Sequence, residues 1–197
     1  MSKNIVSFFL NDKKVQANEN ESIWQVAKRL GEEIPHLCYL DKNSYRADGN
    51  CRACMVEIEG ERVLAASCIR KPSKDMKVNT ASDRAKKSRE LVFELLLADQ
   101  PKKEIAHDPD SNFWNWIDKI EVKESRFPKK NACKPDSSHP SMAVNLDACI
   151  QCNLCVRACR EVQVNDVIGM AYRGENSKIV FDFDDPMGDS SCVACGE

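Results

Sequence analysis

Glycine is scarce in this sequence, and long apolar runs are missing. Only 7 of its 197 residues are glycine, and none of them forms the G-x-G-x-x-G pattern of a phosphate-binding loop. The most apolar internal stretch, residues 91–98, contains Glu94 and is far too short to span a bilayer. The first residues show no secretory apolar core with a cleavage site. We therefore expect a cytoplasmic protein with no membrane span and no nucleotide loop.

The sequence also lacks an excess of charge of one sign. Its 29 Lys and Arg residues nearly balance 31 Asp and Glu residues, which gives a formal charge of −2. This balance gives no support for nucleic acid or an anionic membrane as the main partner. No Ser/His/Asp set and no other acid–base catalyst stands out, so the sequence predicts no catalytic residue.

Cysteine, in contrast, is frequent in this sequence. The chain contains 11 cysteines, a fraction below that of small disulfide-bonded scaffolds. In a reducing compartment, grouped thiols are more often metal ligands than disulfides. Four of them lie in residues 38–68, one is Cys133, and six lie in residues 149–195. Because the sequences around the two groups differ in character, we expect two metal-binding modules joined by a middle section.

The first group has one close pair and two distant partners, in the order Cys38-x12-Cys51-x2-Cys54-x13-Cys68. A [2Fe–2S] cluster needs two thiolates on each iron, and this spacing predicts one. Gly49, Asn50 and Ala53 are small or flexible, so backbone N–H groups can approach the cluster sulfides and raise its potential. The alternative is a four-thiolate zinc site, but zinc favours two short-spaced pairs, and only one is present.

The sequence around the first group predicts a small α+β domain of the β-grasp type. Apolar or alternating residues predict strands at 5–10, 15–17, 54–59, 62–65 and 76–78. Ser22 is the expected N-cap of a helix that ends at Leu30, before Gly31.

A second, longer helix is expected over residues 82–98. Its expected apolar stripe consists of Leu91 and Leu95 with the neighbouring Val92, Phe93 and Leu96, whereas Arg89 is expected to lie in solvent. Residues 108–111 predict a turn and a cap before a short helix that starts at Phe113.

The second group begins with a C-x2-C-x2-C-x3-C pattern, formed by Cys149, Cys152, Cys155 and Cys159. In this pattern the first three thiolates hold one [4Fe–4S] cluster, and the fourth ligates a neighbouring cluster. The same pattern starts again at Cys192 and Cys195, which we expect to hold a second [4Fe–4S] cluster together with Cys159. Each set lacks one ligand, so we expect the native chain to continue beyond Glu197.

The residues around the first group resemble a known family. Three segments are similar to the N-terminal ferredoxin domain of the complex I large subunit, namely residues 34–39 (IPHLCY), 49–60 (GNCRACMVEIEG) and 66–68 (ASC). The same domain opens the large subunit of NAD-dependent formate dehydrogenases and the diaphorase small subunit of NAD-reducing hydrogenases. Three later segments most resemble the alpha subunit of a cytosolic molybdenum formate dehydrogenase, namely residues 144–148, 160–169 and 179–188.

This resemblance implies an electron-transfer protein. In that family formate is oxidised at a bis-molybdopterin guanine dinucleotide in a downstream domain. Electrons then pass through the [4Fe–4S] and [2Fe–2S] clusters to flavin- and iron–sulfur-containing NAD-reducing subunits. The implied partners are therefore those subunits and the chain's own downstream domain. A complex I large subunit and a hydrogenase diaphorase small subunit are the nearest alternatives. A metal-bound sensor or interaction module is an alternative of another class.

The middle section departs from the family pattern. Relatives carry a [4Fe–4S] cluster with one histidine and three cysteine ligands just after the long helix. Gln100 stands where that histidine would precede Pro101, and no cysteine lies nearby, so we predict that this cluster is absent. We expect His107 to be an ordinary loop residue and Cys133 to be a free thiol. The expected organisation is a [2Fe–2S] domain at 1–80, a helical linker at 81–140 and a [4Fe–4S] domain at 141–197.

Overall fold

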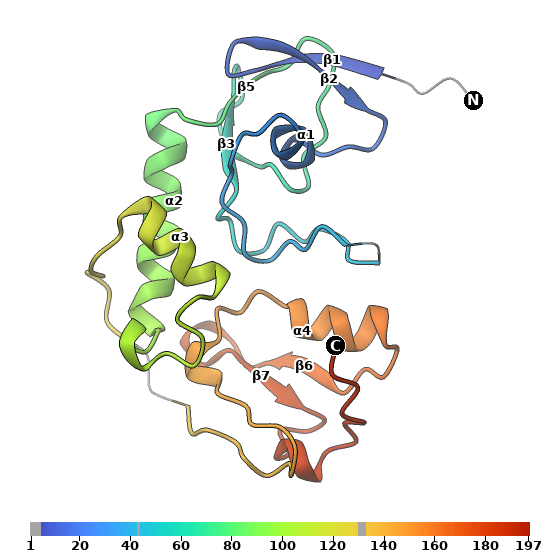
Figure 1. The fold of residues 1–197 in the computed structure, drawn as a ribbon, viewed down its shortest axis with the longest axis vertical. Coiled ribbons are helices and arrows are strands. Elements are labelled where there is room, and N and C mark those ends of the chain that lie inside the picture. The colour runs from blue at the N-terminus through green and yellow to red at the C-terminus, as the bar shows by residue number, and fades with distance from the viewer. Residues whose placement is uncertain (1–4, 43, 130–132) are drawn as a thin grey trace. The chain divides into compact units, whose positions relative to one another are not determined.

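The computed structural model describes residues 5–42, 44–129 and 133–197, which fold into two compact units (Figure 1). Unit 1 runs to Tyr39 and resumes as Ala47–Phe93, whereas unit 2 comprises Leu40–Arg46 and Glu94–Glu197.

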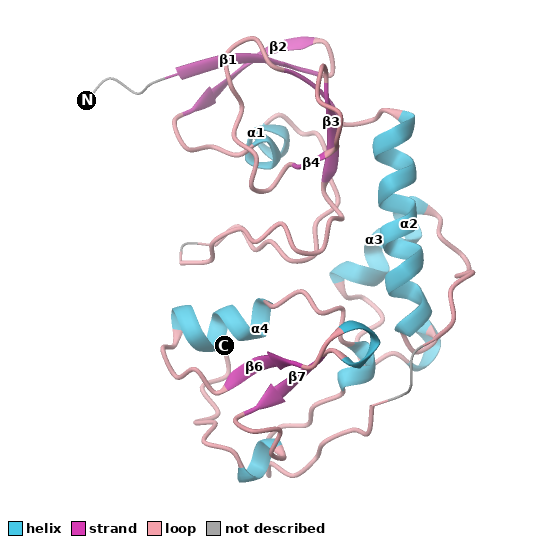
Figure 2. Cartoon of the chain, turned by 180° about the vertical axis from the view of Figure 1, so that it is seen from behind, coloured by secondary structure: helices cyan, strands magenta, loops and turns pink. Residues whose placement is uncertain are grey.

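Unit 1 is built on a five-stranded sheet with the strand order β2-β1-β5-β3-β4. Figure 2 draws the strands in magenta. Its strands are β1 (Ile5–Leu10), β2 (Lys13–Asn18), β3 (Met55–Ile58), β4 (Ala65–Ala66) and β5 (Lys77–Asn79). β1 and β2 form a hairpin whose two turn residues, Asn11 and Asp12, both have positive φ, as a tight two-residue turn requires. β5 lies between β1, to which it is parallel, and β3, to which it is antiparallel.

Helix α1 (Ile23–Arg29) packs its apolar side chains into the core of unit 1. Its N-terminus is a capping box in which the Ser22 hydroxyl accepts from the Gln25 backbone N–H and the Gln25 side chain accepts from Ser22 N–H. Gly31 follows the helix with φ +80, a conformation that glycine adopts without strain. The helix contributes Ile23, Trp24, Val26 and Ala27 to a core that also contains Phe8, Leu10 and Val56.

Helix α2 (Asp83–Asp99) begins where the sequence predicts, with the Ser82 hydroxyl accepting from the Ala85 N–H at 3.2 Å. Two expectations about its faces are wrong. Leu95 is half exposed, whereas Arg89 is only 8% exposed. The reason is that the buried stripe runs through Ala85, Arg89 and Phe93, at a spacing of four residues. Arg89 lies on that stripe because backbone carbonyls satisfy its guanidinium.

Strand β4 is shorter than expected and starts later. Pairing with β3 is confined to Ala65 and Ala66, opposite Val56 and Met55, instead of extending over residues 62–65. Arg62 lies outside the ladder because Gly60, with φ +82, and the turn after β3 keep it away from the strand.

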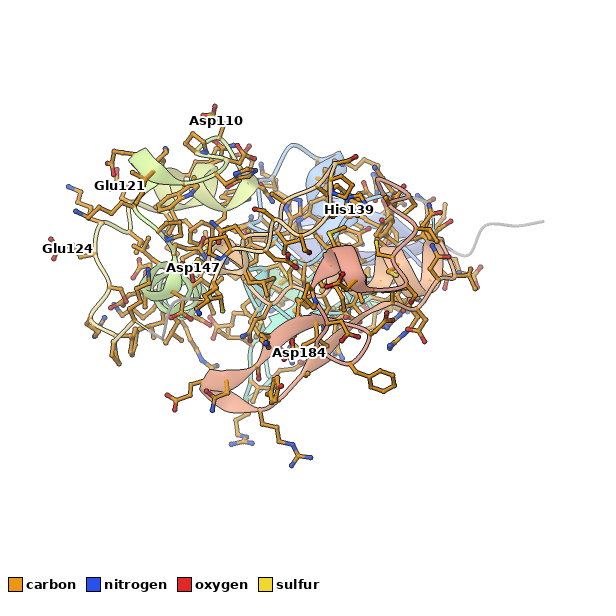
Figure 3. The ribbon with its side chains drawn as sticks, turned by 90° about the horizontal axis from the view of Figure 1, so that it is seen from below. Asp110, Glu121, Glu124, His139, Asp147 and Asp184 are labelled. Atoms are coloured by element: carbon orange, nitrogen blue, oxygen red, sulfur yellow. The ribbon has the colours of Figure 1, made fainter. Side chains whose placement is uncertain are left out.

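Unit 2 contains short helices and one hairpin, joined by irregular segments. Its helices are α3 (Asn112–Ile120) and α4 (Leu154–Arg157), and α4 continues directly into a π-helical turn at Ala158–Val162. Strands β6 (Ile168–Ala171) and β7 (Lys178–Phe181) pair antiparallel. Near this hairpin, Asp184 (labelled in Figure 3) accepts from Lys178 at 2.8 Å and from Tyr172 at 3.0 Å.

Unit 2 also contains single turns of 3-10 helix. They are Lys103–Ile105, Leu146–Ala148, Gly174–Asn176 and Met187–Asp189. Over the residues that the structure describes, no helix combines the length and the apolar character that crossing a membrane would need.

Candidate metal centres

The four cysteines of the first group come together in unit 1. The backbone N–H of Cys38 donates to the sulfur of Cys51, and the N–H of Cys51 donates to the sulfur of Cys38, both at 3.4 Å. The thiols of Cys51 and Cys68 donate to Cys38, and Cys68 is also hydrogen-bonded to Cys54. All four sulfurs are therefore linked in one chain of contacts, although 29 residues lie between the first cysteine and the last in sequence.

These contacts lower the pKa of two of the thiols and raise the pKa of the other two. Hydrogen bonds from Cys51 and Cys68 lower the pKa of Cys38 to about 2, and a hydrogen bond from Cys68 lowers the pKa of Cys54 to about 7. Hydrogen bonding to those acceptors, together with burial, raises the pKa of Cys51 and of Cys68. Because a metal binds thiolates, metal binding here would displace the protons that now hold the sulfurs together.

Small residues and backbone bonds shape the loop around these sulfurs. Gly49 has φ +61, and a Cβ atom there would lie only 2.9 Å from the Ile69 Cδ1 atom. Ala53 is fully buried. The Ser67 hydroxyl donates to the Cys54 carbonyl at 2.7 Å and so ties together the segments that carry two of the cysteines. This loop therefore packs closely around the thiols, and its donor set of four cysteines fits a small cluster.

The second group begins with a loop of left-handed residues. Gln151 and Asn153, which flank Cys152, have φ of +52 and +60. The Gln151 N–H donates to the sulfur of Cys149 at 3.3 Å. Such a backbone turns successive N–H groups inward, which suits an anionic ligand. Desolvation, together with nearby Cys152 and Cys149, raises the pKa of Cys155 to about 11, although that residue as a whole is exposed.

The last two cysteines repeat this backbone pattern. Ala194 and Gly196 flank Cys195 with φ of +53 and +76, just as Gln151 and Asn153 flank Cys152. The two segments therefore share backbone conformation as well as cysteine spacing. We take this repeat as evidence that residues 192–196 form a second loop of the same kind.

Cys159 and Cys192 lie against the same small core of Val167, Phe181 and Met187. The Val167 N–H also donates to the sulfur of Cys159 at 3.3 Å. The structure thus brings two of the three residues predicted for the second [4Fe–4S] cluster to one hydrophobic cluster.

The segment before Cys192 is held by Asp182, one of three aspartates in an acidic turn of the sequence. Asp182 accepts from the Ser191 N–H at 2.6 Å and from the Ser191 hydroxyl at 2.9 Å. The only sequence signal was an acidic turn, which says nothing about its partner.

Gln100, His107 and Cys133 belong to the middle section. Gln100 is 9% exposed, and its Nε2 has no hydrogen-bond partner within the described part of the chain. His107 is exposed. Cys133 is half-buried, and its N–H donates to the Asp147 carboxylate at 2.7 Å.

Within residues 5–42, 44–129 and 133–197, no three His, Cys, Asp or Glu side chains converge on a point suited to a single metal ion. In a [2Fe–2S] cluster each iron is bound by two thiolates, and in a [4Fe–4S] cluster each iron is bound by one thiolate.

The fold and the first site define a class of domain. Residues 3–83 match the family described as "2Fe-2S iron-sulfur cluster binding domain". Unit 1 accordingly contains a [2Fe–2S] ferredoxin domain within a mixed α+β fold, as the sequence predicts.

Longer similarities extend beyond this domain. The chain is 30% identical over 200 residues to the NADP-reducing hydrogenase subunit HndD of Solidesulfovibrio fructosivorans. This alignment covers 98% of this chain and 34% of the relative. It is 29% identical over 185 residues to an NADH-quinone oxidoreductase subunit of Rickettsia prowazekii (strain Madrid E), covering 89% of this chain and 26% of the relative. The chain thus spans about a third and about a quarter of these relatives.

A solved structure shares the fold. It is the crystal structure of a NAD+-reducing [NiFe]-hydrogenase in the H2-reduced state, with a TM-score of 0.83 and 24% sequence identity. The match covers 96% of this chain and 80% of that one. The likeness therefore extends through both units.

Proposed function

We propose that this chain is the iron–sulfur electron-transfer module of an NAD(P)-linked oxidoreductase. The observation that carries the proposal is the hydrogen-bonded chain formed by Cys38, Cys51, Cys54 and Cys68 in a domain that matches a [2Fe–2S] family. Bound iron–sulfur clusters supply one-electron oxidation and reduction with little change in geometry. The chain itself binds the clusters, orients them and controls their exposure to water.

In this proposal Cys38, Cys51, Cys54 and Cys68 are the four ligands of the [2Fe–2S] cluster. Cys38, Cys54 and Cys68 are buried, so most of the site is shielded from solvent. The Cys38 and Cys51 N–H groups already point at sulfur, and such bonds favour the more negative, reduced form of a bound cluster.

We further propose two [4Fe–4S] sites, with the ligands Cys149, Cys152 and Cys155 at the first and Cys159, Cys192 and Cys195 at the second. The repeated left-handed backbone around Cys152 and Cys195 supports both sites. The shared packing of Cys159 and Cys192 supports the second. The functional domains would then be residues 1–80, for the [2Fe–2S] cluster, and 141–197, for the [4Fe–4S] clusters, joined by the linker at 81–140.

The electron donor is proposed to be formate, oxidised at a bis-molybdopterin guanine dinucleotide in a downstream catalytic domain, with flavin- and iron–sulfur-containing NAD-reducing subunits as partners. The residues that support formate are those at 144–148, 160–169 and 179–188. A second candidate donor is dihydrogen, because the relative at 30% identity is named as a hydrogenase subunit. A complex I assembly is a third setting, since another relative is an NADH-quinone oxidoreductase subunit.

The test is electron paramagnetic resonance (EPR) of the protein purified anaerobically from its complete gene. We expect about ten iron atoms per chain, two from the [2Fe–2S] cluster and four from each [4Fe–4S] cluster. Adding formate, dihydrogen or NADH separately should show which compound reduces the clusters. A colourless protein that contains zinc would overturn the proposal.

A matched pair of variants tests the ligand assignment. Cys54→Ser should remove the [2Fe–2S] signal, because Cys54 is a proposed ligand. Cys133→Ser should leave every signal in place, because its thiol belongs to no proposed site. A [2Fe–2S] signal that survives in Cys54→Ser would contradict the assignment.

A further inference from the structure

Two basic side chains are buried within the described part of the chain, and each lies beside a cysteine motif. Arg89 is 8% exposed and Arg157 is 2% exposed. Burying a guanidinium is costly, so buried arginines normally have a specific interaction that offsets the loss of water. Both arginines lie beside proposed cluster ligands, so the negative charge of a bound thiolate-ligated cluster is a candidate partner for each guanidinium.

Arg89 extends from α2 to the first cysteine site. Its Nε donates to the carbonyl of Met55, the residue after Cys54, at 2.9 Å, and its Nη2 donates to the Thr80 carbonyl at 2.5 Å. The guanidinium is close enough to interact electrostatically with the Cys54 sulfur, which is itself 1% exposed.

Arg157 occupies the corresponding place in unit 2. It stands two residues from both Cys155 and Cys159. Its Nη2 donates to the Cys152 carbonyl and its Nε to the Asn153 carbonyl, both at 3.4 Å, and its Nη1 donates to the Arg46 carbonyl. The charge is therefore held against the loop that carries Cys149, Cys152 and Cys155.

We propose that Arg89 and Arg157 set the reduction potentials of the clusters bound beside them, an inference that rests on the proposed function. A thiolate-ligated cluster gains negative charge on reduction, so a fixed positive charge nearby favours the reduced form and raises the potential. Arginine keeps its proton at all ordinary pH values. The carbonyl acceptors are neutral, so these bonds satisfy the donors without cancelling the charge. Burial protects the interaction from screening by salt.

The structure offers a matched exposed arginine for each site. Arg84 lies on α2 five residues before Arg89, with its side chain 49% exposed. Arg160 lies three residues after Arg157, with its side chain 55% exposed and paired with Asp166 at 2.5 Å. These two residues carry the same charge near the same motifs, but each is about half exposed and paired with a carboxylate, Arg84 with Glu57 and Arg160 with Asp166. They therefore serve as controls in which solvent and a counter-charge screen the arginine.

The experiment is an EPR-monitored redox titration of the protein from its complete gene. In R157Q the equilibrium constant for one-electron reduction of the [4Fe–4S] cluster should fall by at least tenfold. This corresponds to a midpoint potential about 59 mV more negative, and the potential of the [2Fe–2S] cluster should stay unchanged. In R89Q the [2Fe–2S] signal should shift in the same way, with the [4Fe–4S] signals unmoved. R84Q and R160Q should shift neither signal by that amount.

The lysine variants R89K and R157K separate charge from geometry. Both keep the positive charge but lose the fork of donors, and both should retain potentials within tenfold of the wild type. Glutamine variants that contain their clusters and keep wild-type reduction potentials would overturn the inference. So would lysine variants that shift as far as the glutamine variants, or glutamine variants that lose the clusters altogether, because either result makes the role geometric. Absence of the [4Fe–4S] signals from the wild type would instead overturn the proposed function, and the Arg157 assignment with it.

Discussion

Gly188 has no room for a side chain. A Cβ atom there would lie 2.5 Å from the Ser138 carbonyl oxygen and 2.9 Å from the His139 N, and both are backbone atoms that cannot rotate away. Gly188→Ala should therefore separate the two segments and destabilise unit 2 by about 1–3 kcal/mol.

Gly169 is the matched control for this prediction, because a Cβ atom on it would meet nothing within 4 Å. Gly169→Ala should leave the free energy of unfolding unchanged or raise it slightly, since alanine restricts the unfolded chain. Urea unfolding of both variants makes the comparison. Equal midpoints in the two variants would show that the close approach at Gly188 is unimportant.

Single residues also mark the limit of sequence reasoning. The four cysteines of the first site follow a spacing that the sequence displays, and the structure brings them together. Arg89 shows no such signal, because its burial depends on carbonyls at Met55 and Thr80, which are distant in sequence. Local periodicity assigns a charged residue to solvent, and only the tertiary contact reverses that assignment.

Helix α1 is tied to the preceding hairpin by an ion pair. Arg29, in its last turn, donates to Glu21 through Nε at 2.9 Å and Nη2 at 3.0 Å, and also donates to the Gln16 carbonyl. The hydrogen bond from Arg29 lowers the pKa of Glu21 below its ordinary value of 4.5. A lowered folded pKa means that the pair stabilises the fold above the unfolded pKa and that this contribution is lost as the pH falls through the folded pKa.

Glu21→Gln should therefore lower the free energy of unfolding by about 0.5–1 kcal/mol at pH 7, a modest value because Arg29 is partly exposed and screened. The difference from the wild type should shrink below about pH 4.5, where Glu21 of the unfolded chain takes up its proton, and vanish as the pH falls through the lower pKa of the folded state. Urea midpoints measured across this range test the sign. Exposed Glu19→Gln should change the midpoint little at any pH, and a difference for Glu21→Gln that grows on acidification would contradict the account.

The turn after β7 positions the last cysteine loop. Asp182 holds both the N–H and the hydroxyl of Ser191, immediately before Cys192. Asp182→Asn should weaken these charge-assisted bonds and reduce the occupancy of the second proposed [4Fe–4S] site while sparing the first. Iron content and EPR measure the loss. Asp185→Asn, on the same turn, is the control, and equal cluster content in the two variants would remove Asp182 from this role.

The elements differ in how far the sequence predicts them. The capping box at Ser22 and the β1–β2 hairpin depend on neighbouring residues, so they are found where the sequence places them. The division of the chain is not local. Leu40–Arg46 belongs to unit 2, where Tyr45 donates to Glu197 at 2.8 Å and Arg46 pairs with Glu161 at 2.8 Å. No short-range pattern reports contacts across more than a hundred residues.

Two compact units with separate cores should unfold separately. Unit 1 has the core around Phe8, Val56 and Val78, whereas unit 2 has its own around Val167 and Phe181. A metal site contributes its binding free energy only to the unit that holds it. Calorimetry of the cluster-loaded protein should therefore show two transitions, and Cys54→Ser should lower the temperature of one and leave the other within error. Cys133→Ser should lower neither by a comparable amount. A single transition that moves as a whole in Cys54→Ser would mean that the units fold as one cooperative body, and that a cluster lost from the first site is felt at the others.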